Sequence, residues 1–275
     1  MLKQTQKQLA VCSWSLKPDS PQTLIARLRE IPITRVQLAL NPLYYDPVWR
    51  DAPFILRDAG IKVVSGMIEN GEENYSSPAA IRATGGLAPT LPFMNLFSRV
   101  TRYKIMMEQL GITDVSFHAG ATPAVGDQWH EIIAYRLESL AKYFSFSEKN
   151  LLLETGQDPA DTLSDFLDEV ASPNTYVNFD PGNMLLYNMG DPIAALKKLL
   201  PRIAQVHIKD AVASGDPDVW GVEHPAGEGD VDWPAFFDIL SNADYTGNLV
   251  IERECGENPV EDIRRAINYL SRFLE

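Results

Sequence analysis

Four short apolar segments in the second half of the chain each end in an ionisable side chain. In chain order these side chains are Glu154, Asp180, His207 and Glu252. Each directly follows apolar residues of the kind that fill buried parallel strands. Three carboxylates and one imidazole form a hard ligand set, which suits Mn2+, Mg2+ or Co2+ and also accommodates Zn2+. The pattern predicts one divalent-metal site at four strand ends.

Electrostatics favours a cation shared by this set. Three carboxylates that meet at one point repel each other strongly unless a cation lies between them. Each residue alone has an ordinary interpretation, because a carboxylate at a strand end is often a helix cap and His207 alone fits a hydrogen-bonded core histidine. Four such residues from consecutive strands favour the metal site over these separate interpretations.

A metal site of this kind fits proton movement next to a carbonyl group. The ion would bind a substrate carbonyl and an adjacent hydroxyl oxygen and stabilise an enediolate as a Lewis acid. Glu154 and Glu252 are the predicted acid and base, because one carboxylate would take a proton from carbon and the other would return it. Transfer between opposite faces gives epimerisation, transfer between adjacent carbons gives isomerisation, and loss of a β-hydroxyl gives dehydration.

Strand and helix patterns alternate eight times along the chain. The predicted strands are Gln8–Ser13, Arg35–Leu40, Ile61–Met67, Asp114–Gly120, Leu151–Glu154, Thr175–Asp180, Ile203–Asp210 and Asn248–Glu254. Helical patterns lie between them, and Pro259–Leu274 is the last predicted helix. This alternation predicts an α/β fold, a single (β/α)8 TIM barrel over residues 1–275. A doubly wound open sheet is disfavoured, because no glycine-rich phosphate loop follows the first strand.

Composition limits the partners. Net charge is 24 − 37 = −13, so the surface repels polyanions and nucleic acid is not an expected partner. The only apolar run near the N-terminus, Leu9 to Cys12, is too short for a signal peptide, and no stretch is long enough to cross a membrane. Cys12 and Cys255 are expected to be reduced thiols in or beside buried strands. These features predict a cytoplasmic enzyme or binding protein.

Five segments together resemble the sugar phosphate isomerase/epimerase family, which has the xylose-isomerase-like barrel. The matching segments are Leu151–Glu154, Asn178–Asn183, Val206–Asp210, Pro225–Trp233 and Leu249–Glu254. The resemblance implies a divalent-metal site at the four residues named above, with Glu154 and Glu252 as the acid/base pair. It also implies a sugar or keto-sugar substrate. Family members include ketose 3-epimerases, hydroxypyruvate isomerase and inosose dehydratase, so the substrate stays open.

One position departs from the ketose 3-epimerase pattern. Those enzymes have a histidine three residues after the metal-binding aspartate, whereas this chain has Asn183. Asparagine can hydrogen-bond a hydroxyl group but cannot titrate near neutral pH. The substitution argues against a ketohexose 3-epimerase.

Several more residues are candidates for substrate contacts. Lys209 should point the same way as His207, two residues earlier, and either neutralise an oxyanion or pair with Glu228 or Asp210. Glu228 lies in a glycine loop expected to cover the mouth, and Arg253 should point toward the helices with substrate still within reach. The other candidates line strand ends: Trp14, Glu69, His118 and Asn183.

The residues alone leave other functions open. A keto-sugar dehydratase or lyase would use the same metal and base, and a non-catalytic barrel would bind sugars without turnover. Endonuclease IV shares the barrel but needs several zinc ions and many histidine ligands, whereas this chain has four histidines. Leu43, Tyr44 and Tyr45 are candidates for a homo-oligomer interface or a substrate rim.

Overall fold

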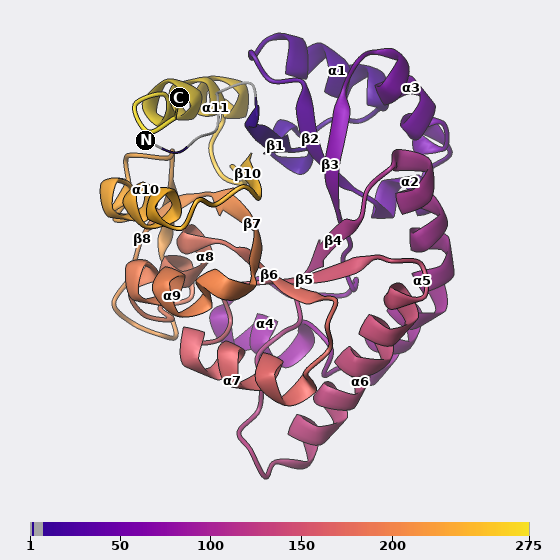
Figure 1. The fold of residues 1–275 in the computed structure, drawn as a ribbon, viewed down its shortest axis with the longest axis vertical. Coiled ribbons are helices and arrows are strands. Elements are labelled where there is room, and N and C mark those ends of the chain that lie inside the picture. The colour runs from indigo at the N-terminus through magenta and orange to yellow at the C-terminus, as the bar shows by residue number, and fades with distance from the viewer. Residues whose placement is uncertain (1, 3–7, 275) are drawn as a thin grey trace.

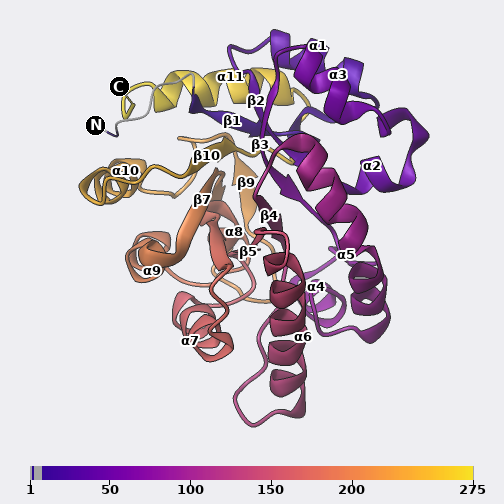
Figure 2. The same ribbon diagram turned by 45° about the vertical axis from the view of Figure 1, so that its right-hand side comes forward.

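The computed structural model describes residue 2 and residues 8–274, and its centre is a closed barrel of parallel strands. Figures 1 and 2 show the strands inside a ring of helices. The order around the barrel is β1-β10-β7-β6-β5-β4-β3-β2, which confirms the predicted (β/α)8 fold. These strands are β1 (Ala10–Cys12), β2 (Arg35–Ala39), β3 (Lys62–Met67), β4 (Asp114–Phe117), β5 (Asn150–Glu154), β6 (Thr175–Phe179), β7 (Ile203–Ile208) and β10 (Asn248–Ile251).

The helices begin where the sequence supplies caps. Ser20 Oγ accepts a hydrogen bond from the Thr23 amide at 3.1 Å, and Pro21 occupies the first turn of the first helix. The α-helices are α1 (Pro21–Arg29), α2 (Asn41–Tyr45), α3 (Ala52–Asp58), α4 (Pro78–Thr84), α5 (Thr90–Leu110), α6 (Gln128–Ser145), α7 (Ala160–Val170), α8 (Pro181–Leu186), α9 (Pro192–Leu199), α10 (Trp233–Asn242) and α11 (Pro259–Leu270). Short 3-10 helices are η2 (Trp14–Leu16), η3 (Pro47–Trp49) and η4 (Leu200–Arg202).

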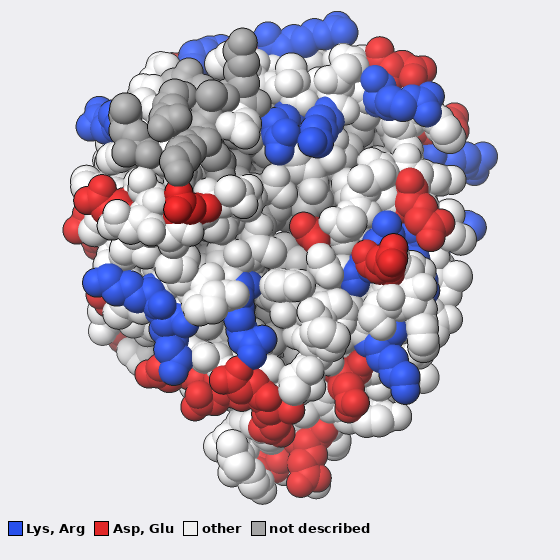
Figure 3. Space-filling view, in the orientation of Figure 1, with Lys and Arg blue, Asp and Glu red and all other residues white. Residues whose placement is uncertain are grey.

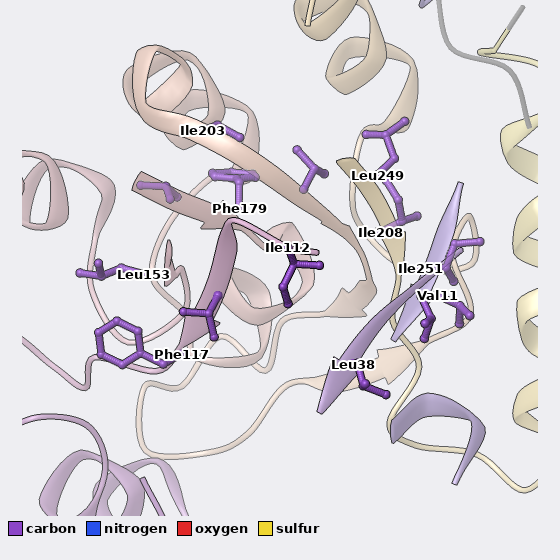
Figure 4. Packing of buried hydrophobic residues seen from close by; sticks show 14 of the residues in the cluster. Val11, Leu38, Ile112, Phe117, Leu153, Phe179, Ile203, Ile208, Leu249 and Ile251 are labelled. Carbon is purple, nitrogen blue, oxygen red and sulfur yellow. The ribbon is translucent and has the colours of Figure 1, made fainter. Parts of the chain in front are cut away.

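The main core lies between the barrel and its helices. Strand side chains alternate in direction, and one set packs outward against the helices (Figure 4). This outward set includes Val11, Leu38, Phe117, Leu153, Phe179, Ile208 and Ile251. Burying each such side chain contributes about 1.5–3 kcal/mol to stability. The inward set includes a small apolar cluster of Ala10, Cys12 and Val250, and it also includes the buried polar side chains of Gln37, Gln205 and His207.

Two sequence expectations about the segments after β7 and β10 are wrong. The sequence pattern places no strand between Ile203–Asp210 and Asn248–Glu254 and favours a long loop from Ala211 to Val231, but this stretch contains part of a hairpin formed by β8 (Asp210–Val212) and β9 (Val222–His224). Cys255 was expected in or beside a buried strand, yet its side chain is exposed because β10 ends at Ile251. Cys12 is buried as expected.

The surface carries charges of both signs. On the face in Figure 3, Lys and Arg side chains are interspersed with Asp and Glu. Within the described part of the chain, no helix combines the length and apolar character needed to cross a membrane.

Candidate metal centre

Glu154, Asp180, His207 and Glu252 meet inside the barrel mouth, as the sequence predicts. They occupy inward positions at the ends of β5, β6, β7 and β10, and one ligand atom from each lies within 4.8 Å of the others. His207 Nδ1 is the common neighbour of the three acids. It lies 3.2 Å from Glu252 Oε2, 3.4 Å from Asp180 Oδ2 and 3.5 Å from Glu154 Oε1.

The donor set fits a divalent cation. Asp180 Oδ1 accepts a hydrogen bond from the Asn183 amide at 2.8 Å and so caps α8, but Asp180 Oδ2 is buried without a hydrogen-bond partner. An unsatisfied buried carboxylate oxygen is costly. Burial raises the pKa of Asp180 to about 7. A metal ion among the four ligand atoms would satisfy this oxygen and neutralise the acids.

The second nitrogen of His207 is held by Gln37, a residue on β2. Gln37 Nε2 donates to the Gly66 carbonyl at 3.3 Å and to Ser116 Oγ at 2.6 Å, which turns Gln37 Oε1 toward His207. His207 Nε2 lies 2.7 Å from that oxygen and 3.0 Å from Asn178 Nδ2. Because the closer contact is to an acceptor, and Asn178 Nδ2 also donates to Glu154 at 3.1 Å, we assign the hydrogen to Nε2. In the neutral form that binds a metal, Nδ1 presents its lone pair to the ion while Nε2 keeps its hydrogen, the arrangement typical of metal-binding histidines. In the metal-free protein burial alone would lower the pKa of His207, but the surrounding acids raise it well above its usual value, so Nδ1 is protonated as well.

A layer of buried amides lies beneath the cluster. Gln205 Nε2 donates to Gln37 Oε1 at 2.9 Å and to Asn178 Oδ1 at 3.2 Å, while Ser65 Oγ donates to Gln205 Oε1 at 2.6 Å. Gln37, Asn178 and Gln205 are fully buried. The sequence analysis missed these three residues. Their signal is a single amide at an inward position of an otherwise apolar strand, where it needs a buried partner.

The two candidate acid/base glutamates have different surroundings. Glu154 accepts hydrogen bonds from Asn178 Nδ2 at 3.1 Å and Asn183 Nδ2 at 2.9 Å. Glu252 accepts one from Trp14 Nε1 at 2.6 Å and one from Lys209 Nζ at 3.2 Å. Burial alone would raise the pKa of Glu252, but the positive charges of Lys209 and His207 outweigh it and hold the pKa well below its usual value.

Burial and nearby positive charges also have opposite effects on the pKa of Glu154. Burial favours its protonated form, whereas the charges of His207 and His118 lower its pKa. Both glutamates therefore favour the carboxylate form, which is the form that binds a metal or accepts a proton.

A cavity of about 540 Å³ lies above the cluster. Trp14, His118 and Asn183 line it, as predicted, together with Glu154 and Glu252. Among the described residues that line it there are six glutamates and no lysine or arginine. The six are Glu69, Glu72, Glu73, Glu154, Glu252 and Glu254. Lys209 lies beneath this cavity, 1% exposed, with its ammonium group paired to Glu252 and Glu254.

Three contacts differ from those expected. Lys209 pairs with neither Glu228 nor Asp210, because Glu252 and Glu254 follow the adjacent strand β10 and are nearer. Glu228 pairs instead with Arg265 of α11 at 2.7 Å, so it does not cover the mouth. Arg253 points toward the helices, as strand alternation predicts, but it lies outside the cavity lining.

Arg253 has a structural role at the end of β10. Its guanidinium group pairs with Glu223 at 2.6 Å and with Asp262 at 2.9 Å. Glu223 also accepts a hydrogen bond from the Glu254 amide at 3.0 Å. These contacts fix the chain just after Glu252.

The glycine-containing segment from Pro225 to Trp233 is fastened by Asp210. This buried carboxylate accepts hydrogen bonds from the Gly227 amide at 2.8 Å, the Val231 amide at 3.1 Å and Trp233 Nε1 at 2.8 Å. A side chain at Gly229 would overlap Asp210. The segment therefore holds the β7 end of the barrel together rather than contacting a substrate.

A comparison with family models identifies the family to which this barrel belongs. The model described as xylose isomerase-like TIM barrel matches residues 97–273, which include all four ligand residues. The chain belongs to the xylose isomerase-like TIM barrel family. A xylose isomerase domain protein from Planctomyces limnophilus has the same fold, with a TM-score of 0.87 and 25% identity over 97% of each chain.

Other similar proteins have a named activity or a bound ligand. An inosose dehydratase of Clostridium perfringens is 32% identical over 125 residues, 40% of this chain and 41% of the relative, so the match spans less than half of either protein. A family protein from Mycobacterium smegmatis in complex with magnesium has a TM-score of 0.71 at 15% identity, covering 98% of this chain and 97% of that one. A D-allulose 3-epimerase from Methylomonas sp. in complex with D-allulose has a TM-score of 0.69 at 17% identity, covering 99% of each chain.

Proposed function

We propose that this protein is a divalent-metal-dependent enzyme that moves a proton next to a carbonyl group of a sugar or keto-sugar. The observation that carries the proposal is the convergence of Glu154, Asp180, His207 and Glu252 within 4.8 Å beneath a cavity of about 540 Å³. Mn2+, Mg2+ or Co2+ suits this mostly oxygen donor set best. When bound, the ion would supply Lewis-acid polarisation of a carbonyl oxygen.

The chain itself supplies the proton transfer. Glu154 faces the cavity as a carboxylate whose oxygens are oriented by Asn178 and Asn183, and it serves as the base that removes a proton from carbon. Glu252, oriented by Trp14 and Lys209 on a different strand, is also a carboxylate. The proton that it returns to carbon is therefore first taken up from water in the cavity, and Glu154 releases its own proton to water to complete the cycle. Reprotonation on the other face or on the neighbouring carbon makes the enzyme an epimerase or isomerase.

The substrate hydroxyl groups have partners in the same cavity. His118 and Asn183 line it and carry polar groups suited to hydrogen-bonding hydroxyls. Trp14 gives an aromatic face for the apolar side of a sugar ring. These three residues are the proposed substrate contacts, while Glu228 and Arg253 are not, because both pair elsewhere.

A keto-sugar dehydratase is the second candidate. The observation that favours it is the similarity to inosose dehydratases, at 32% identity over 125 residues. Glu154 would remove the same proton from carbon and pass it to the departing β-hydroxyl group, which would leave as water in place of reprotonation at carbon.

Proton exchange tests both candidates. Protein loaded with Mn2+ is incubated in D2O with ketoses, keto-glycosides and their phosphates, and deuterium in recovered substrate is measured by mass spectrometry. Wild-type protein is expected to incorporate deuterium, and a product lighter by one water identifies the dehydratase. No exchange with any member of the panel would contradict the proposal.

A further inference from the structure

A second cavity lies beside the first and shares two walls with it. It has a volume of about 620 Å³, and both cavities are lined by Trp14 and Glu69. The other lining residues come from the segments that follow β1 and β2. They include Lys17, Asp19, Ala39, Asn41, Tyr45 and Trp49.

The first cavity has aromatic walls on the opposite side of the barrel. Tyr187 follows β6, which lies across the barrel from β1 and β2, and its ring packs against Trp220 with centroids 4.7 Å apart. Both rings line the first cavity. A substrate larger than one sugar ring would therefore extend toward Trp14 and Glu69.

Trp14 is a fixed boundary between the two cavities. Its indole Nε1 donates to Glu252 Oε1 at 2.6 Å, and its ring centroid lies 6.3 Å from that of His207. One edge of the ring is thus tied to the metal centre. A molecule that spans both cavities must pass this ring, which offers the flat apolar surface on which a sugar stacks.

The lining of the second cavity matches carbohydrate chemistry. Tyr45 adds exposed aromatic surface, whereas Trp49 is 5% exposed and adds little. The Asp19 carboxylate is of the kind that binds hydroxyls, while the Asn41 amide is already hydrogen-bonded to the Glu69 backbone and to Tyr103. Lys17 is the one lysine among the described residues that line this cavity, and they include no arginine. An uncharged sugar ring fits this lining better than a phosphate group, which is bound by clustered cations.

We infer that the second cavity is a sugar subsite and that the preferred substrate is a ketose that carries a second sugar ring. The ketose unit lies over the metal cluster, and the second ring lies between Tyr45 and Trp14. This inference rests on the proposed function of the metal cluster.

Binding of matched sugars tests the subsite without turnover. Affinities of Mn2+-loaded protein are measured by calorimetry for D-fructose and for three disaccharides that attach glucose to fructose: turanose, maltulose and isomaltulose. At least one disaccharide is expected to bind about tenfold more tightly than D-fructose, the effect of one or two aromatic contacts. Ala39→Phe, which fills the second cavity, is expected to remove this advantage and leave D-fructose binding within about twofold.

A second pair of variants guards against misfolding. Tyr45→Ala removes an exposed ring and should also reduce the disaccharide advantage, whereas Tyr135→Ala, an exposed tyrosine on α6 outside both cavity linings, should not. Disaccharides that bind no more tightly than D-fructose, or an advantage that survives in both Ala39→Phe and Tyr45→Ala, overturn the inference. Tight disaccharide binding without deuterium exchange would reject the proposed function and keep the subsite.

Discussion

Replacing Gln37 by leucine removes the hydrogen-bond acceptor behind His207 while keeping a side chain of similar size. In the native chain Gln37 Oε1 lies 2.7 Å from His207 Nε2, and both side chains are fully buried. Leucine leaves the Nε2 hydrogen facing the weak acceptor Cys12 Sγ, 3.8 Å away, in place of the Gln37 oxygen, and both Cys12 and His207 are fully buried. An orphaned buried donor costs about 1–3 kcal/mol. The imidazole can escape this cost by moving its hydrogen to Nδ1, which then cannot bind a metal.

We expect Gln37→Leu to lower the affinity for metal by more than a general loss of folding stability would explain. Partners that orient a metal-binding histidine typically contribute about 10–100-fold to affinity. Calorimetric titration with Mn2+ should therefore show a dissociation constant about 10–100-fold higher for Gln37→Leu than for the wild type. Selective 15N labelling of the four histidines gives an independent measure, because the His207 ring nitrogens should lose the signature of a hydrogen fixed on Nε2.

Asn174→Leu is the matched control. Asn174 is also buried, and its amide donates to the Ala141 and Lys149 carbonyls at 2.8 and 2.9 Å, outside the metal cluster. This variant should lose stability but retain Mn2+ affinity. If Gln37→Leu binds Mn2+ within about twofold of the wild type, the role assigned to Gln37 is wrong.

Three further predictions concern the ionisable groups. Glu154→Gln or Glu252→Gln should reduce turnover by at least about 10²–10⁴-fold with an unchanged circular dichroism spectrum; full activity in either variant would reject its acid/base role. Because burial raises the pKa of Asp180 to about 7 and metal binding requires its carboxylate, Mn2+ affinity measured by titration should increase as pH rises through 7, and a flat profile would contradict this. The hydrogen bond to Glu169, at 2.8 Å, raises the pKa of His130 above 6.5, so its stabilising effect is full below pH 6.5 and is lost as pH rises through the raised value; urea unfolding of Glu169→Gln should lack this pH-dependent part.

Much of the barrel follows from the sequence because short apolar strands alternate with helices along the chain, and in some strands the inward and outward side chains differ in polarity. In Ile203–Ile208, for example, Val206 and Ile208 face the helices while Gln205 and His207 face the interior. Parallel strands place their carboxyl ends at one mouth, so the convergence of Glu154, Asp180, His207 and Glu252 could be predicted without coordinates.

The contacts between long side chains could not be predicted in this way. Lys209 had several acidic neighbours in sequence, and the choice of Glu252 and Glu254 depends on the register between β7 and β10, where His207 pairs with Val250. Glu228 sits in a glycine loop whose direction is set by the buried Asp210, which the sequence alone does not position. The second cavity likewise depends on how the chain bends after β1 and β2.

Metal stoichiometry tests the central claim most directly. Free Mn2+ is measured by electron paramagnetic resonance during titration into metal-free protein, with Asp180→Ala and His207→Ala in parallel. We predict that the wild-type chain removes one equivalent of Mn2+ from solution and that both variants bind it far more weakly. A wild-type titration in which the free Mn2+ signal rises from the first addition would contradict the claim that these four side chains hold a divalent ion.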